Sequence, residues 1–160
     1  MQATHHIFNR ARHEETGQAL VEFVLVVPIL ILLVLGTLDL GKAYNYWIDT
    51  THLSATGARW AAVNKNPGPG ATLQESIRAQ ADTAELRDGG TGAVADPIQV
   101  CIDFPDGEDV GDRVVVTVST EYSFLNYLQV ETDLTSKSIT GSSTMRLEQV
   151  PTNISAGCTA

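Results

Sequence analysis

The sequence predicts an α+β fold in which a long N-terminal transmembrane helix continues into an exported domain with a short second helix and a small antiparallel sheet of about three strands. Three observations support this prediction. Residues 19–38 form an apolar run long enough to cross a bilayer, for which about 20 residues suffice. Apolar residues recur every three or four positions over 39–63, which is a helical period, and every two positions from residue 98, which is a strand period.

The composition limits the classes of function. The chain has 160 residues, which fits one domain, and a formal net charge of −9. Nucleic-acid binding needs clustered Lys and Arg, so this acidic chain argues against a nucleic-acid partner. Much of the apolar composition is concentrated in residues 19–38, and the core of the exported domain must therefore be small.

The charges that flank the apolar run predict its orientation. Arg10 and Arg12 precede the run, and the positive-inside rule places that end in the cytoplasm. We therefore expect a single pass through the cytoplasmic (inner) membrane, with membrane lipid as a partner. A secretory signal peptide has a shorter apolar core followed by an Ala-x-Ala-like site, which is missing here, while a plain signal anchor stays open. The predicted parts are a cytoplasmic leader (1–17), a transmembrane helix (18–39), an exported extension of that helix (40–63) and a small exported α+β domain (64–160).

A single helix is predicted from about Gln18 to Val63, with a kink at Pro28 because proline removes one backbone hydrogen bond. One helical face collects apolar and small side chains in its outer half. We expect this face to cover the sheet, with Trp47, Ile48 and Ala55 among the covering residues. Its members are Leu40, Tyr44, Trp47, Ile48, Thr51, Ala55, Ala58 and Ala62.

The remainder of the chain contains one helical signal and three strand signals. Residues 64–70 are dense in turn formers, and Thr72 with Glu75 predicts a capping box for a second helix over roughly 73–87. Alternating apolar and polar residues predict half-buried antiparallel strands. These strands cover residues 98–104, 114–124 and 136–148. The tail from Pro151 lacks any period and is predicted to be loose, except where Cys158 holds it.

A single carboxylate interrupts the apolar run near its start. Glu22 would cost about 2.5–3.5 kcal/mol at the centre of a bilayer and less near the interface. Such residues are usually functional, and a partner should exist for the charge. Gly17 lies five positions before Glu22, directly ahead of the run.

The segment Gly17-Gln-Ala-Leu-Val-Glu-Phe together with Pro28 resembles the TadE-like family of minor pilins, or pseudopilins, of the tight-adherence (Flp) pilus system, which is related to type IV pili. Asp39, Gly41 and the stretch Gly57-Ala-Arg-Trp-Ala-Ala-Val extend the similarity. The resemblance covers roughly residues 16–63.

The resemblance implies that the chain is processed and assembled. Gly17 would precede the bond cut by a prepilin peptidase, and Gln18 would be the first mature residue. The implied partners are this peptidase, other pilins and an inner-membrane assembly platform, and the implied function is pilus assembly and adhesion. The new ammonium at Gln18 of one subunit could pair with Glu22 of the next, because a paired buried carboxylate is tolerated and fixes register. Main type IV pilins begin with Phe, so the departure at Gln18 leaves N-methylation open.

Other sites receive less support. An acid-rich loop (103–112) lacks the spacing of an EF-hand, and no residue set matches a zinc site or a hydrolase motif. We expect a protein that is not an enzyme, with no catalytic residue, metal or cofactor. Cys101 and Cys158 are a candidate disulfide if the domain is exported, the alternative being two independent thiols. An uncleaved single-pass membrane protein, whose exported domain binds a ligand or envelope component, is the alternative function.

Overall fold

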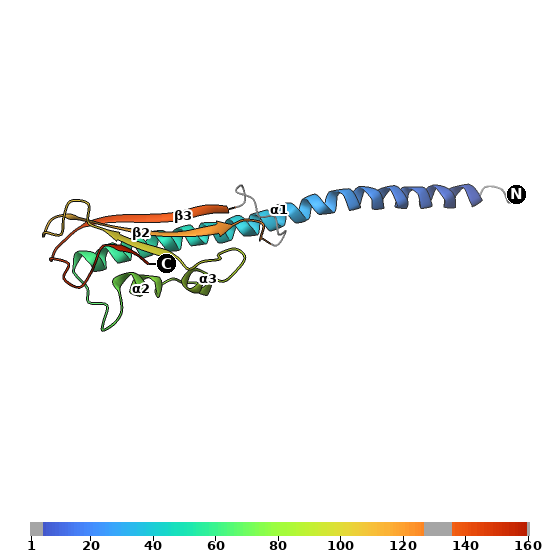
Figure 1. Cartoon of the computed structure of the whole chain (residues 1–160). Coiled ribbons are helices and arrows are strands. Elements are labelled where there is room, and N and C mark those ends of the chain that lie inside the picture. The colour runs from blue at the N-terminus through green and yellow to red at the C-terminus, as the bar shows by residue number, and fades with distance from the viewer. Residues whose placement is uncertain (1–4, 127–135, 160) are drawn as a thin grey trace. The chain divides into compact units, whose positions relative to one another are not determined.

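The computed structural model describes residues 5–126 and 136–159, with side chains described from Gly17 onward. Residues 1–4 of the predicted leader lie outside the described residues, as do all the leader side chains before Gly17. The chain forms two compact units, Met1–Leu38 and Asp39–Ala160. We call these unit 1 and unit 2. The elements in chain order are α1 (His5–Ala62), α2 (Leu73–Arg78), α3 (Ala84–Asp88), β1 (Gln99–Asp103), β2 (Arg113–Ser123), β3 (Ser136–Arg146) and β4 (Gly157–Thr159) (Figure 1).

The long helix is confirmed, although it begins earlier than the sequence predicted. α1 starts at His5 rather than at about Gln18, since no proline or glycine interrupts residues 5–16. It continues through Pro28 and ends at Ala62. Among the described residues, one helix segment, Gly17–Ala62, is long and apolar enough to cross a membrane. The predicted α+β class with a transmembrane-like helix is thereby confirmed.

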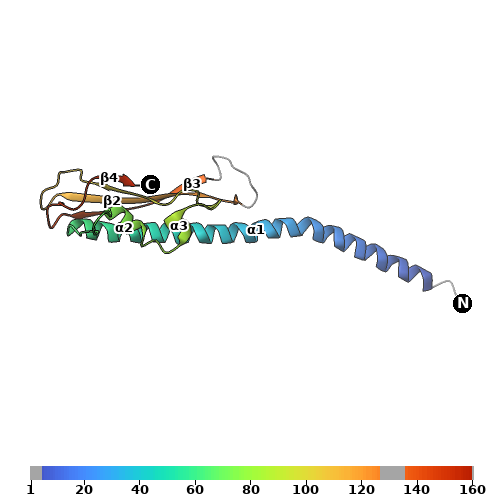
Figure 2. The same ribbon diagram turned by 60° about the horizontal axis from the view of Figure 1, so that its bottom comes forward.

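Unit 2 contains a four-stranded antiparallel sheet in the order β3-β2-β1-β4. Figure 2 labels β2, β3 and β4 of this sheet, above the outer part of α1. The three predicted strands are present, with β2 paired to β3 from Arg113↔Arg146 to Ser123↔Ser136. The fourth strand, β4, was not predicted: Gly157–Thr159 pairs with Val100–Ile102 of β1 at Cys158, the point where the tail was expected to be held. A strand of three residues is too short to display a period in the sequence.

The predicted second helix is two short helices. The capping box at Thr72 and Glu75 opens α2 as expected. The chain then turns, and the Oδ2 atom of Asp49 on α1 accepts a hydrogen bond from the Asp82 amide (3.1 Å). Thr83 caps a new helix, α3, by accepting a hydrogen bond from the Leu86 amide (3.3 Å). The single helix over 73–87 was wrong because these side chains satisfy the backbone outside a continuous helix.

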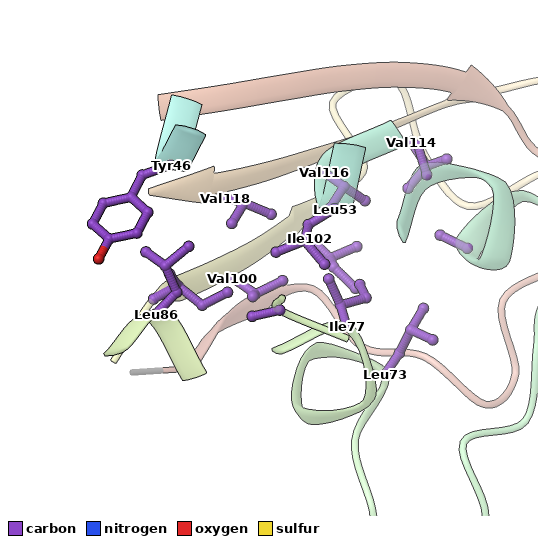
Figure 3. Packing of buried hydrophobic residues seen from close by; sticks show 14 of the residues in the cluster. Tyr46, Leu53, Leu73, Ile77, Leu86, Val100, Ile102, Val114, Val116 and Val118 are labelled. Atoms are coloured by element: carbon purple, nitrogen blue, oxygen red, sulfur yellow. The ribbon is translucent and has the colours of Figure 1, made fainter. Parts of the chain in front are cut away.

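The core of unit 2 lies between the sheet and the helices, and Figure 3 shows Leu53 of α1 among strand and helix side chains that include Ile77, Val100 and Val116. The helix face predicted to cover the sheet is mostly wrong: Trp47 and Ile48 are each 48% exposed. The side chains that α1 buries instead lie on a neighbouring face of the helix, and most of them are small or polar. They include Asp39, Ala43, Tyr46, Asp49, Thr50, Leu53, Ser54, Ala58 and Ala61.

Close approach between helix and sheet explains this choice of face. A Cβ atom added at Gly141 of β3 would lie 2.5 Å from the carbonyl carbon and oxygen of Thr50. A Cβ atom added at Gly57 would lie 2.6 Å from Cδ1 of Ile77. Near Gly141 the backbones are too close for a large side chain between them, so the small residues Thr50 and Ser54 lie there. Tyr46 and Leu53 are buried elsewhere along the same helix face.

Candidate functional site

The predicted processing residues lie together on α1. Gly17, Gln18 and Glu22 are all exposed in unit 1. Glu22 lies five positions after Gly17 on the helix, a rise of about 7.5 Å. Gln18 and Glu22 are four residues apart, so they share one helix face. Among the described residues, Glu22 has neither a hydrogen bond nor an ion pair.

The helix surface around this carboxylate is apolar. Phe23 and Leu25 are 66% and 68% exposed, and apolar exposure continues through Val34 and Leu38. Exposed apolar surface of this extent marks contact with a membrane or with another protein. The Glu22 carboxylate therefore lies at one end of an exposed apolar surface of the kind that a membrane or another protein buries.

Sequence reasoning missed two buried carboxylates on the unit 2 part of α1. Asp39 is buried, and its carboxylate accepts hydrogen bonds from the Tyr122 hydroxyl and from the Leu125 amide (2.7 Å). Tyr122 also packs edge-on against Tyr46, with ring centroids 5.5 Å apart. Leu125 has a positive φ of 54°, a conformation that non-glycine residues rarely adopt, and the hydrogen bond that its amide donates to Asp39 helps to hold it. These contacts fasten the end of β2 to α1.

Asp49 is the second of these carboxylates. Burial raises the pKa of Asp49, and the hydrogen bond from the Asp82 amide opposes that rise only in part. A signal for both residues existed in the sequence. Asp39, Ala43, Tyr46 and Asp49 are also spaced by three and four positions, which defines a second helix face beside the apolar one.

A polar cluster joins α1 to α3. Glu85 accepts a hydrogen bond from the Tyr46 hydroxyl and pairs with Lys42 (Nζ–Oε2 3.2 Å). The hydrogen bond from Tyr46 is the main cause of the lowered pKa of Glu85, with Lys42 adding to it. Burial raises the pKa of Tyr46, which keeps its hydroxyl a proton donor to this carboxylate. The cluster fixes one flank of α1 against α3.

The structure joins Cys101 of β1 to Cys158 of β4 by a disulfide, across directly paired strand positions. In the acid-rich loop, Arg113 donates a hydrogen bond from Nη2 to Oδ1 of Asp106 (2.8 Å), which lowers the pKa of this carboxyl. Oδ2 of Asp112 accepts a hydrogen bond from the Asp109 amide (3.1 Å).

In the part of the chain that the structure describes, no group of three or more His, Cys, Asp or Glu residues could hold a metal ion.

The features that bear on function therefore gather along α1, from Gly17 to the buried carboxylates of unit 2. This stretch matches a known protein family. Residues 17–59 match the family described as TadE-like protein. No curated protein and no solved structure matches the chain.

The TadE-like segment contains Gly17, Glu22, Asp39 and Gly57, and it ends before the first strand of the sheet. The resemblance to the TadE-like family is confirmed over this range, which includes most of the helix segment that is long and apolar enough to cross a membrane. The sheet and its disulfide lie outside the TadE-like segment.

Proposed function

We propose that the chain is a minor pilin, or pseudopilin, of a Tad pilus, which is cleaved after Gly17 and acts in pilus assembly and adhesion. The observation that carries the proposal is the TadE-like helix itself: an apolar surface exposed over residues 20–38, with one unpaired carboxylate, Glu22, at its start among the described residues. A subunit that moves from a membrane into a filament needs an apolar helix surface, because this surface contacts lipid before assembly and other subunits after it.

The disulfide supports an exported unit 2. Disulfides persist in oxidising compartments and are rare in the cytosol. The Cys101–Cys158 bond lies in the sheet of unit 2, downstream of the apolar segment. With Arg10 and Arg12 upstream, the positive-inside rule then orients the chain with its N-terminus in the cytoplasm.

Cleavage after Gly17 would give Glu22 its partner. A prepilin peptidase would release the leader and leave an ammonium group at Gln18. That group would lie one helical turn from Glu22 of its own chain and within reach of a neighbouring subunit. Glycine lowers helix stability by about 1 kcal/mol relative to alanine, which favours local opening of the helix at the bond to be cut.

The N-terminus of the purified protein tests processing. Full-length chain is produced in cells with and without a prepilin peptidase, and its start is read by sequencing and intact mass. We expect the chain to begin at Gln18 only when the peptidase is present. Gly17→Leu should block cleavage, whereas the matched change Gly36→Leu, at a helix position that is also uncrowded, should not. A leader that stays intact beside active peptidase would refute the proposal.

The role of Glu22 is tested after processing is established. Glu22→Gln keeps the size of the side chain and removes its charge, so cleavage should continue while incorporation into pili is lost. Glu22→Asp should restore part of the incorporation, because it retains the charge. Incorporation of the Gln variant at the normal level would show that Glu22 does not pair during assembly.

The alternative, an uncleaved single-pass protein with a ligand-binding exported domain, is favoured by one feature of the sheet. A hollow of about 360 Å³ is lined by polar side chains that include Gln99, Ser119 and Glu121. Ligand sites usually have volumes of about 300–1,000 Å³ but are mostly apolar. This alternative requires an intact leader in the native membrane, so the N-terminal measurement separates the two functions.

A further inference from the structure

The sheet of unit 2 has one long open edge. β3 contains 11 residues and, among the strands that the structure describes, pairs with β2 alone, in an unbroken antiparallel register. Proteins protect such edges with proline, bulges or inward charges, because the unpaired backbone groups accept another strand. β3 has no proline or bulge, and its two charged residues, Lys137 and Arg146, lie near or at its ends. The edge is therefore suited to pair with a further strand.

An apolar stripe runs along α1 on the same side as this edge. Lys42 contacts Glu85 and Asp49 contacts Asp82, so these residues face the flank of α1 that carries α3. Successive helix residues are rotated by about 100°, which places Leu40, Tyr44 and Trp47 on the opposite flank. These three side chains, which we call the stripe, are 64%, 61% and 48% exposed.

The position of β3 agrees with this assignment. Gly141 of β3 lies against the Thr50–Thr51 peptide group of α1. Figure 1 shows β3 on one side of this part of the helix and α2 and α3 on the other. The open edge and the stripe thus lie along the same side of unit 2.

The two sides of unit 2 carry opposite charge. β3 contains two cationic residues and no acid, a net charge of +2. Residues 73–96, which include α2 and α3, contain five acids and two arginines, a net charge of −3. α2 is also tied to the β4 side, since the Gln74 side chain donates to the Ser155 carbonyl (3.1 Å). The β3 side and the side formed by β4, α2 and α3 are therefore complementary in charge.

We propose that the β3 edge of one copy docks against the β4 side of a second copy and extends the sheet from one subunit to the next. Each neighbouring pair of strands in the order β3-β2-β1-β4 is antiparallel, so β4 runs opposite to β3. A second copy in the same orientation, displaced sideways, therefore brings its β4 antiparallel to β3. Two β3 edges from such copies would instead pair in parallel, which is slightly less stable.

This contact joins two different surfaces, and contacts of that kind generate open assemblies unless they close into a ring. The antiparallel pairing requires that neighbouring copies of unit 2 share one orientation. The inference rests on the proposed function and deepens it, because it names a second copy of this chain as a partner and the residues that meet. The neighbour would also cover the stripe.

Cysteine cross-linking of the full-length chain in native membranes tests the contact. Ser142→Cys places a thiol on the exposed face of β3, and Ala156→Cys places one beside β4, also exposed. The two variants carry different tags and are produced together, and a short bismaleimide is added. We expect mixed dimers only, and a ladder of oligomers from the chain that carries both changes. Val110→Cys, which is 62% exposed in the β1–β2 connection, is the matched control.

Two other cross-linking outcomes overturn the proposed docking. Homodimers of the Ser142→Cys variant would show that two β3 edges meet, and a complete lack of adducts would show that the edge is not an interface. Intact mass confirms that the native disulfide is retained, and a thermal scan confirms folding. The N-terminus is read on the same samples: a chain that starts at Gln18 without adducts overturns only the docking, whereas adducts from a chain with an intact leader overturn only the processing.

Lys137→Glu provides an independent variant. It reverses the charge at the start of β3 without altering a buried side chain. We expect loss of most of the mixed adduct at low salt, and the difference from the unmodified residue should shrink as salt screens the charges. An adduct yield that the variant leaves unchanged at low salt would contradict the role assigned to charge.

Discussion

The two halves of α1 use their apolar residues in opposite ways. Over residues 19–38 nearly every side chain is apolar and exposed. Over residues 39–62 the helix buries Asp39, Asp49, Thr50 and Ser54 while it leaves Leu40, Tyr44 and Trp47 exposed. One helix therefore carries two kinds of surface. Residues 19–38 expose an apolar surface suited to contact with lipid or protein, and residues 39–62 have a face that packs closely against the sheet.

The difference shows that hydropathy identifies the membrane segment but not the core-facing side of unit 2. In the first half, contact with a bilayer would determine the side chains, because lipid around the whole helix requires apolar residues on every face. In the second half, the distance between the backbones determines which side chains fit, because the peptide group of Thr50 and Thr51 lies against Gly141. Polar residues are accepted there when hydrogen bonds satisfy them.

The largest expected effect comes from a pair of leucines. Leu53 is fully buried, whereas Leu40 is 64% exposed. Leu53→Ala should lower the free energy of unfolding of unit 2 by about 2–5 kcal/mol, because it leaves a cavity. Leu40→Ala should change it by less than about 0.5 kcal/mol. Urea unfolding of the full chain in detergent, followed by near-ultraviolet circular dichroism, measures both, and equal losses would contradict the assignment of the helix face.

A pair of glycines tests the close approach itself. Gly141→Ala forces a Cβ atom against backbone atoms of α1 and should cost about 1–3 kcal/mol or more, because backbone cannot move aside as a side chain can. Gly41→Ala meets nothing within 4 Å and should stabilise the helix by about 0.5–1 kcal/mol. The same unfolding measurement applies, and a neutral Gly141→Ala would show that the two backbones can separate freely.

A pair of tyrosines tests the buried carboxylate. Tyr122→Phe removes the hydroxyl that donates to Asp39, and a buried group that loses a partner costs about 1–3 kcal/mol. Tyr44 is 61% exposed, so Tyr44→Phe should have almost no effect on stability. Hydrogen exchange of the Leu125 amide gives a local reading, since this amide donates to the same carboxylate. Its protection should fall in the Tyr122→Phe variant alone.

The smallest effect depends on pH. The raised pKa of Asp49 means that the folded chain binds this proton more tightly than the unfolded chain, so its stabilising effect is present in acid and is lost as pH rises through the folded pKa. Asp49→Asn should therefore stabilise the folded state by under about 1 kcal/mol at neutral pH, with no gain in acid.

Glu85 has a lowered pKa, so its effect on stability depends on pH in the opposite direction. Glu85→Gln should destabilise the folded state at neutral pH, and this loss should vanish as pH falls through the folded pKa. Unfolding curves at several pH values measure both variants.

The sequence was sufficient for elements whose signal is long. The apolar run, the 11-residue strands β2 and β3 and the capping box of α2 each follow from composition or period. The TadE-like segment was recognised from Gly17, Glu22 and the residues that follow Pro28.

The remaining features depend on contacts between residues far apart in the chain. Two stripes on α1 share a helical period, and only the approach of Gly141 decides which one is buried. The break before α3 depends on the Asp49 carboxylate, and β4 exists because β1 offers it a partner. Nothing in the local sequence around Asp82 or Cys158 specifies these partners.

The order of strands also has a consequence for the speed of folding. β2 and β3 are neighbours in the chain, as are β1 and β2, whereas β4 must find β1 across a separation that the Cys101–Cys158 bond records as 57 residues. Closing a longer loop costs more entropy, and non-local strand pairing is slow. We therefore expect β4 to join last, so that oxidation of the two cysteines follows the formation of the other three strands and marks the final step in the maturation of unit 2.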